Sequence, residues 1–145
     1  MHRLKNVIYR QKLVTAPPSA TVFEIVQLMN ESEVGAVPIV EDDVLVGVFS
    51  ERDLLRRVVA AERDLKKVRV SEVMTRDVVT ATLEDHVDLC LEKMKRAKCR
   101  HLPVESEGRV ISMIAMRDLL RDELEEQIDE IRFLRAYLHQ TPPRG

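Results

Sequence analysis

The sequence is poor in aromatic residues, with no tryptophan, two tyrosines and three phenylalanines among 145 residues. Proteins that hold single-stranded nucleic acid stack its bases on aromatic side chains, so a surface of that kind is disfavoured. The formal net charge is −2, because 23 basic residues face 25 acidic ones. Since a nucleic-acid-binding domain usually carries a basic excess, we expect no nucleic-acid partner.

Cysteine and long apolar runs are equally scarce. Cys90 and Cys99 are the two cysteines, and their spacing fits neither a CxxC pair nor a common zinc motif. We expect both to be reduced thiols, as is usual in the cytosol. No apolar run approaches the roughly 18–20 residues that span a bilayer, and the N-terminal segment lacks the apolar core of a signal peptide. The sequence therefore predicts a soluble, cytoplasmic protein without a membrane partner.

Catalytic motifs are missing as well. There is no P-loop, no HExxH and no Ser-His-Asp or Cys-His arrangement in a family context, and His86 and His139 have no companions at metal-ligand spacing. We expect no enzyme, no metal site and no obligatory cofactor. The 45% of apolar residues suffices for one core, or for two small halves that share one.

One segment of the sequence is repeated, at an offset of 65 residues. Arg-Asp-Leu-Leu-Arg at 52–56 returns at 117–121, and Pro38 matches Pro103. Between 14–56 and its counterpart there are 11 identities in 43 positions without a gap. An ungapped repeat of this kind indicates two copies of one folding unit.

Each copy reads as β-α-β-β-α. Thr21 and Glu24 form a capping-box pattern ahead of an apolar helical stripe. Ser50 is placed to cap the last helix, with Asp53 three residues on. The expected strands lie in matching places of the two copies, at 13–15, 36–40, 44–49, 78–80, 101–104 and 109–114. A unit this small buries little surface alone, so we expect the copies to pack sheet to sheet with pseudo-twofold symmetry.

The C-terminal part follows a different pattern. Apolar residues recur there every three or four positions: Leu120, Leu124, Ile128, Ile131, Leu134 and Leu138. With acids early and arginines late, this predicts a long amphipathic helix over 122–140, which either folds over its own domain or packs on a second chain. Between the copies, Ser71 is expected to cap a short turn at 72–74. The predicted fold class is α+β, with domains at 7–60 and 72–121.

Two such units, each closing on a strand followed by Ser/Thr-x-x-Asp, resemble a tandem pair of cystathionine-β-synthase-type (CBS) domains, or Bateman module. The resemblance is carried by GVFSERDL at 47–54, VMTRDVVTAT at 73–82 and RHLPV at 100–104. The layout is similar to stand-alone bacterial CBS-pair proteins. It implies that two chains complete a disc, and that clefts between the paired sheets bind adenosine-type ligands such as AMP, ADP, ATP, NAD(H) or S-adenosylmethionine.

A carboxylate at the start of a helix suits such a ligand. It can accept charge-assisted hydrogen bonds from both cis hydroxyls of a ribose, and the free N–H groups of the first turn favour a phosphate close by. Asp53 and Asp118 hold this position in the two copies. Plain helix capping is the alternative role for both. Arg52 and Arg117 point away around the helix, toward a phosphate, a second chain or a solvated ion pair.

Carried over from the family, two clefts each mix the two copies. Cleft A would be lined by Ser50, Asp53, Thr80, Lys98, Arg100, His101 and Pro103. Its cations at 98 and 100, with the histidine nearby, would neutralise a phosphate. Cleft B would be lined by Thr15, Val34, Gly35, Ala36, Pro38 and Asp118. Because Ser112 and Ala115 depart from the family pattern, cleft B is expected to be empty, or to take an adenosine whose charged end lies elsewhere.

The resulting functional hypothesis is a regulatory sensor. An adenine nucleotide (AMP, ADP, ATP or NADH) would bind in cleft A as a regulatory ligand and change the geometry of the domains or of a homodimer, which an unknown downstream protein reads. The alternative is a dimerising scaffold whose clefts have lost their ligands.

Overall fold

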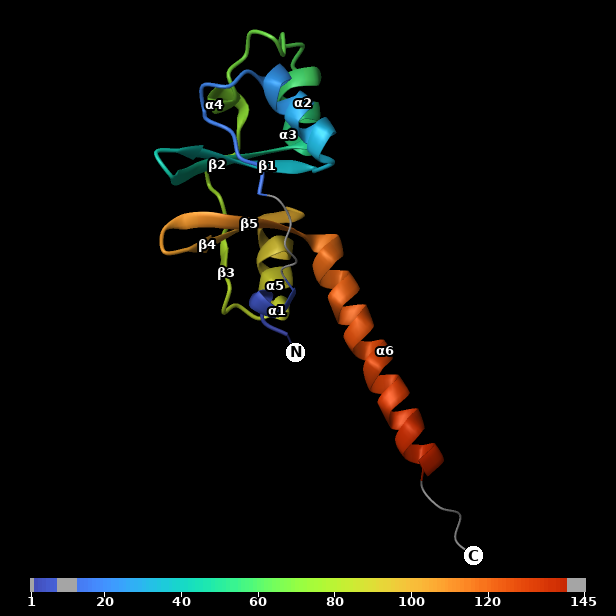
Figure 1. Cartoon of the computed structure of the whole chain (residues 1–145). Helices are drawn as coiled ribbons and strands as arrows, with labels where there is room; N and C mark the ends of the chain where they lie inside the picture. Colours follow the sequence, from blue (N-terminus) through green and yellow to red (C-terminus); the bar gives the residue numbers. More distant parts are fainter. Residues whose placement is uncertain (1, 8–12, 141–145) are drawn as a thin grey trace, which may run out of the picture.

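The computed structural model describes residues 2–7 and 13–140, and it shows two similar α+β halves stacked on each other (Figure 1). Residues 8–12 of the first predicted domain lie outside the described part. The elements in chain order are α1 (Leu4–Val7), α2 (Val22–Ser32), β1 (Ala36–Glu41), β2 (Val44–Ser50), α3 (Glu51–Asp53), the π-helix η1 (Leu54–Val59), α4 (Val70–Val73), β3 (Ala81–Thr82), α5 (Val87–Ala97), β4 (His101–Ser106), β5 (Arg109–Ala115) and α6 (Met116–Gln140).

The repeat in the sequence is also a repeat in the structure, with the same offset of 65 residues. The pairs α2 and α5, β1 and β4, and β2 and β5 begin and end at residues 65 apart. Even the irregularities repeat, because Glu33 and Lys98 both end their helices in the left-handed conformation, at φ 55° and 54°. The register shift of each hairpin also recurs, at 39/40 and at 104/105. The predicted duplication is confirmed.

Each half is built on an antiparallel hairpin. β1 pairs with β2, and β4 with β5, while β3 adds a parallel strand beside β4. In the first half Ala16 takes the place of β3: its N–H donates to the Pro38 carbonyl at 3.2 Å, and its carbonyl accepts from the Val40 N–H at 2.9 Å. The opening strands predicted at 13–15 and 78–80 are therefore placed slightly too early, since the pairing residues are 16 and 81–82.

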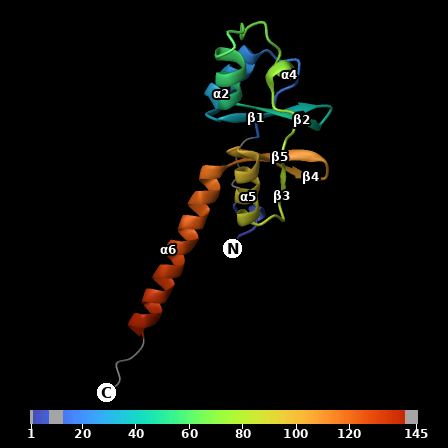
Figure 2. The same cartoon turned by 180° about the vertical axis from the view of Figure 1, so that it is seen from behind.

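The two halves pack through their sheets, as predicted. β5 contacts both β1 and β2. Helices α2 and α4 cover the far side of the first sheet, and α1 and α5 cover the far side of the second (Figures 1 and 2). Each half also has its own apolar core, centred on Phe49 and Ile25 in the first and on Leu102 and Leu119 in the second. The space between the sheets is thus bounded by residues of both repeats.

Of two predicted helix starts, one is confirmed and one is wrong. The capping box is confirmed, because Thr21 Oγ1 accepts from the Glu24 N–H at 3.2 Å and the Glu24 carboxylate accepts from the Thr21 N–H at 3.3 Å. The cap predicted at Ser71 is wrong, because α4 already begins at Val70. An antiparallel bridge between Thr21 and Arg69 fixes an extended residue just before it, so the helix starts one residue earlier.

Helix α6 is continuous from Met116 to Gln140, with no break at the predicted boundary of 122. It leaves the body beside α5 and projects away from both halves (Figures 1 and 2). It therefore does not fold back over its own domain, and its apolar stripe is exposed: Leu120 52%, Leu124 57%, Ile128 39%, Ile131 50%, Leu134 51% and Leu138 69%. Within 2–7 and 13–140, no helix combines the length and the apolar content needed to cross a membrane.

The two cysteines are free thiols, as predicted. Cys90 is fully buried in the second core, and burial raises the pKa of its thiol to about 11. Cys99 is half-buried, and burial raises the pKa of its thiol as well. Neither thiol is set up as a reactive nucleophile, because only the thiolate reacts.

Candidate functional site

The starts of two helices and two strands meet where the sheets face each other. We call this region the strand-start junction and define it as residues 34–36, 50–53, 98–101 and 115–118. In the first half the Glu51 N–H donates to the Gly35 carbonyl at 3.0 Å, and in the second the Met116 N–H donates to the Arg100 carbonyl at 2.8 Å. The repeat thus places each helix start beside the start of its own hairpin.

Contacts across the sheet interface join the two copies at this junction. A Cβ built on Gly35 would lie 3.3 Å from Cε1 of His101, so the two segments touch. Arg52 reaches across as well, and its guanidinium donates to the Lys98 carbonyl at 2.9 Å. This contact ties the turn that carries Asp53 to the segment that carries Arg100. It also gives Arg52 a partner that the sequence did not indicate.

Asp53 is the most heavily bonded residue of the junction. Its Oδ2 accepts from the N–H of Ser50 at 3.0 Å and from the Ser50 hydroxyl at 3.1 Å. Its Oδ1 accepts from the Thr75 hydroxyl at 3.1 Å, and the Nε of Arg57 lies 3.8 Å away. Asp53 is 8% exposed. Asp53 therefore caps α3, which is one of its two predicted roles. Three of the roughly four acceptor positions of its carboxylate are in use.

Thr75 and Arg57 both contact Asp53, and the sequence patterns singled out neither of them. Thr75 exchanges both backbone hydrogen bonds with Val48 of β2, each at 2.9 Å, which places its hydroxyl beside Asp53. Arg57 donates to the Met74 carbonyl at 2.9 Å and so holds the same segment. The signal for Thr75 was its place inside the motif at 73–82, whereas the role of Arg57 follows only from the fold.

The cationic groups of the junction differ in what they offer a ligand. Lys98 and Arg100 are exposed, so both can meet a phosphate. His101 is half-buried, and burial lowers the pKa of its imidazole below its ordinary range, although the nearby Glu51 carboxylate opposes this shift. The imidazole is therefore neutral near pH 7. It can donate or accept a hydrogen bond there, but it offers no positive charge to an anion.

We expect the His101→Gln substitution to reduce the loss of stability in acid. Burial lowers the folded-state pKa of His101 from its ordinary value of 6.5, so below that pH the unfolded chain takes up a proton that the folded chain resists. The free energy of unfolding then falls as the pH drops from 6.5 toward the folded pKa, and this share of the loss disappears in the variant.

Urea unfolding at about pH 7.5 and about pH 5.5 measures the difference between the two proteins. His86→Gln, which replaces an exposed histidine, is measured in parallel as the matched control. The burial argument fails if His101→Gln and the wild type lose the same free energy of unfolding.

The remaining predicted residues lie in or beside the strands. Pro38 and Pro103 are buried at matching positions of β1 and β4, opposite Val48 and Met113. The exposed Thr15 and the half-buried Thr80 precede the residues that pair with these strands, and the Thr80 carbonyl accepts from Lys93 Nζ at 2.9 Å. Val34, Gly35 and Ala36, predicted for cleft B, belong to the junction together with Ser50, Lys98, Arg100 and His101, predicted for cleft A.

Asp118 is the counterpart of Asp53 but has different surroundings. It is half-buried, and its charge acts on the nearby His101. Ala115 stands where Ser50 stands in the first repeat, so this position supplies no hydroxyl to the helix start. The two aspartates are therefore inequivalent, as the sequence differences around them predict.

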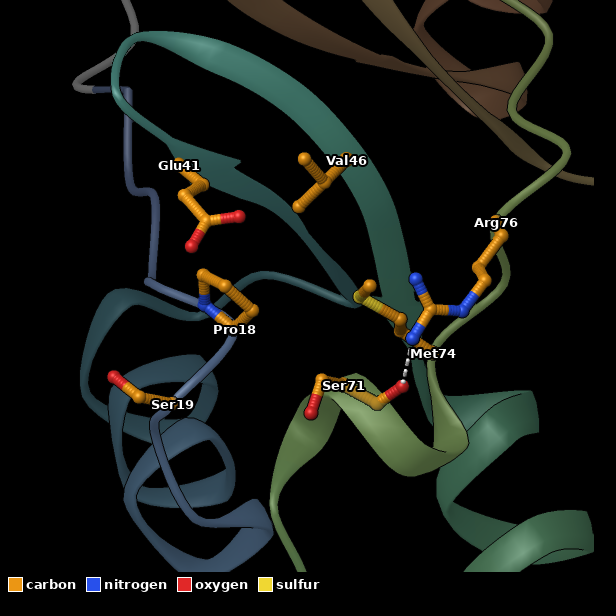
Figure 3. A pocket seen from close by; sticks show the side chains of 7 residues that line it. All are labelled: Pro18, Ser19, Glu41, Val46, Ser71, Met74 and Arg76. Atoms are coloured by element: carbon orange, nitrogen blue, oxygen red, sulfur yellow. Dashed lines mark hydrogen bonds between the residues drawn. The ribbon is translucent and has the colours of Figure 1, made fainter.

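A pocket of about 390 Å³ lies away from the junction, on the outer side of the first sheet (Figure 3). It is lined by Pro18, Ser19, Glu41, Val46, Ser71, Met74 and Arg76. Arg76 closes one side by donating to the Ser71 carbonyl at 2.8 Å. None of the residues predicted for clefts A and B belongs to this pocket.

The segment that carries Thr75 packs tightly on Gly47. A Cβ at Gly47 would lie 2.5 Å from Met74 Sδ and 2.9 Å from the Thr75 carbonyl oxygen. We therefore expect Gly47→Ala to lower the free energy of unfolding by about 1–3 kcal/mol, because the segment must move to make room. Urea unfolding measures the change.

The counterpart of Gly47 in the second repeat provides the control. Ser112 already carries a Cβ, so its replacement by alanine adds no atom to a packed contact, and the residues 9–10 that correspond to 74–75 in the first repeat lie outside the described part of the chain. Ser112→Ala should change stability less than Gly47→Ala. Equal effects would show that the contact with 74–75 is not the cause.

Comparison with known proteins identifies the family. The family model for the CBS domain matches the chain twice, over residues 4–60 and 70–125. The chain therefore belongs to the CBS-domain family and carries two consecutive copies. The CBS domain-containing protein YhcV of Bacillus subtilis is 29% identical over 127 residues, which cover 88% of this chain and 89% of YhcV. Several other curated relatives are longer, and the chain spans 20% to 60% of their length.

Solved structures show the same fold. A CBS-domain protein from Burkholderia ambifaria superimposes with a TM-score of 0.82 at 30% identity, over 87% of this chain and 96% of that one. The CBS domain protein PAE2072 from Pyrobaculum aerophilum, solved in complex with AMP, has a TM-score of 0.73 at 28% identity, over 81% of this chain and 89% of that one.

Proposed function

We propose that the protein is a regulatory module that binds an adenine nucleotide (AMP, ADP, ATP or NADH) at the junction, in the predicted cleft A. The observation that carries this proposal is the position of Asp53, in the first turn after β2 and linked through Arg52 to the segment 98–101 of the other repeat. The AMP complex of the related PAE2072 supports the ligand class. The domain boundaries at 7–60 and 72–121 and the cytoplasmic location remain part of the same proposal.

The hydrogen bonds of Asp53 give the ribose a place to bind. A ribose hydroxyl is chemically equivalent to the Thr75 hydroxyl that now donates to Oδ1 at 3.1 Å. We propose that the ribose takes over this position, exchanging one hydroxyl donor for another, while Ser50 keeps Oδ2 in place. The exchange costs little, because the number of hydrogen bonds to the carboxylate is conserved.

The phosphate end would be bound by Lys98 and Arg100, which are exposed beside the start of β4. Thr80 and Pro103 would line the same cleft, as the resemblance to the family implies. His101 would contribute a hydrogen bond rather than a charge, since the pKa of its imidazole is lowered by burial. Cleft B, with Asp118, lacks comparable cations at 34–36 and is the weaker site in this proposal.

Displacement of the Thr75 hydroxyl also suggests how binding is transmitted. Residues 74–76 connect α4 of the first half to β3 of the second, and Arg57 and Val48 hold them in place. A ligand that loosens Thr75 from Asp53 acts on the connection between the halves. A downstream protein would read the resulting change of domain or dimer geometry, and the role is non-catalytic.

We further propose that the chain forms a homodimer through α6. Its six stripe residues are 39–69% exposed and recur with the spacing of a helix–helix seam. A second copy presents the same stripe and so can cover it. This surface also supports the second candidate function, a scaffold that dimerises without a ligand.

Mass spectrometry of small molecules retained after mild purification separates the two functions. The sensor proposal expects an adenine nucleotide in the released fraction, and a smaller amount from the Asp53→Asn variant. A ligand-free protein that also fails to bind added AMP, ADP, ATP or NADH would leave the scaffold as the function.

A further inference from the structure

A cluster of metal-binding side chains lies outside the junction, where the N-terminal segment meets α6. His2, Asp122 and Glu126 each present a ligand atom, and these atoms all lie within 4.8 Å of one another. Nδ1 of His2 is 3.0 Å from both carboxylate oxygens of Asp122. Asp122 and Glu126 are one helical turn apart, so their side chains share one face of α6. The cluster therefore joins two segments that are 120 residues apart.

The backbone fixes His2 although it is the second residue of the chain. Its carbonyl accepts a hydrogen bond from the Val87 N–H at 3.0 Å, and Arg3 forms an antiparallel bridge with His86. Leu4 is fully buried in the core of the second half. The imidazole is thus presented from an anchored segment, which lowers the entropy lost when a ligand orders it.

A further carboxylate lies beside the cluster. Glu123 lies between the two acidic ligands in sequence, and its Oε1 is buried without a hydrogen-bond partner among the described residues. Carboxylates gathered around a histidine, with one oxygen left unsatisfied, form a setting that a divalent cation would stabilise.

We propose that His2, Asp122 and Glu126 bind a divalent transition metal, with Zn²⁺ as the best match. One imidazole nitrogen and two carboxylate oxygens are donors that Zn²⁺ accepts, and three protein ligands leave a fourth position for water. The neutral imidazole would coordinate through Nδ1 in place of its hydrogen bond to Asp122. The ion would link α6 to the N-terminal segment and so fix the direction in which the helix leaves the body.

The test uses the full chain with its own N-terminus, any purification tag being placed at the C-terminus and removed. After treatment with a chelator, Zn²⁺ is titrated by calorimetry, and Co²⁺ is added separately to record its visible d–d absorption. We expect one ion per chain. His2→Ala should weaken Zn²⁺ binding by at least about 100-fold, since even the loss of an outer-shell partner costs about 10–100-fold. Glu126→Gln should also weaken it and abolish the Co²⁺ spectrum.

Matched controls separate this site from other metal-binding groups. His86→Ala removes a neighbouring histidine, and Cys99→Ser removes the more accessible thiol; both should bind Zn²⁺ as the wild type does. Circular dichroism confirms that each variant is folded. The proposal is overturned if the wild type binds no stoichiometric Zn²⁺, or if His2→Ala and Glu126→Gln bind it as tightly as His86→Ala.

Discussion

The Asp53→Asn substitution is expected to weaken the binding of AMP by roughly 10–100-fold, as measured by isothermal titration calorimetry. Asparagine keeps the shape of the side chain and can still accept from Ser50, but it removes the negative charge that a ribose hydroxyl would bond to. Hydrogen bonds to charged groups contribute about 1.5–3 kcal/mol, which corresponds to this range of affinity. Because Asp53 also caps α3, thermal unfolding must first show that the variant is folded at the temperature of the titration.

Asp118→Asn is the matched control, because Asp118 holds the same position in the second repeat. It should leave the affinity for AMP within a few-fold of the wild type. Thr75→Val, which removes the hydroxyl without changing the volume, should tighten binding by about 2–10-fold if the ribose displaces that hydroxyl from Asp53. Equal affinities in the wild type, Asp53→Asn and Asp118→Asn would contradict the assignment of Asp53 to the ribose.

The double substitution Leu124→Glu and Ile131→Glu is expected to convert the proposed homodimer into a monomer. The two side chains are 57% and 50% exposed in the single chain, so glutamate costs little there. In a paired helix the same glutamates would be buried beside each other's counterparts, where an unpaired charge costs several kcal/mol. Light scattering coupled to size-exclusion chromatography should show half the wild-type mass.

The polar face of α6 supplies the control for this experiment. Glu125→Gln and Arg132→Gln change two exposed residues that lie next to the stripe in sequence but not in it, and this variant should remain a dimer. Circular dichroism should show the same helix content in all three proteins. A wild type that is monomeric across the concentrations used, or a stripe variant that stays dimeric, would rule out α6 as the interface.

The fold was largely predictable because one signal, the 65-residue repeat, constrains every element twice. The hairpins and long helices follow from it, since apolar periodicity and turn residues agree in both copies. The misses are local. Ser71 suits a cap by residue type, yet the bridge of Arg69 to Thr21 sets the start of α4. Such a bridge joins segments far apart in sequence, and neither segment has a local pattern that predicts it.

The candidate site was predictable only in part, for a similar reason. Asp53 stands out because it recurs as Asp118, but its bond to Thr75 depends on the pairing of that residue with Val48. The cluster at His2 depends on the N-terminal segment reaching α6 and has no counterpart in the repeat. Candidate site residues that occur in both repeats can therefore be recognised in the sequence. Residues contributed by segments that are not repeated cannot.

The most direct test of the central claim is a calorimetric titration of nucleotide-free protein with AMP and, in parallel, with its analogue that lacks both cis ribose hydroxyls. If a carboxylate at the start of a helix binds the ribose hydroxyls, AMP binds saturably and the dideoxy analogue binds at least about 10-fold more weakly. Equal binding of the two compounds would contradict the account, as would no binding of AMP, ADP, ATP or NADH at all.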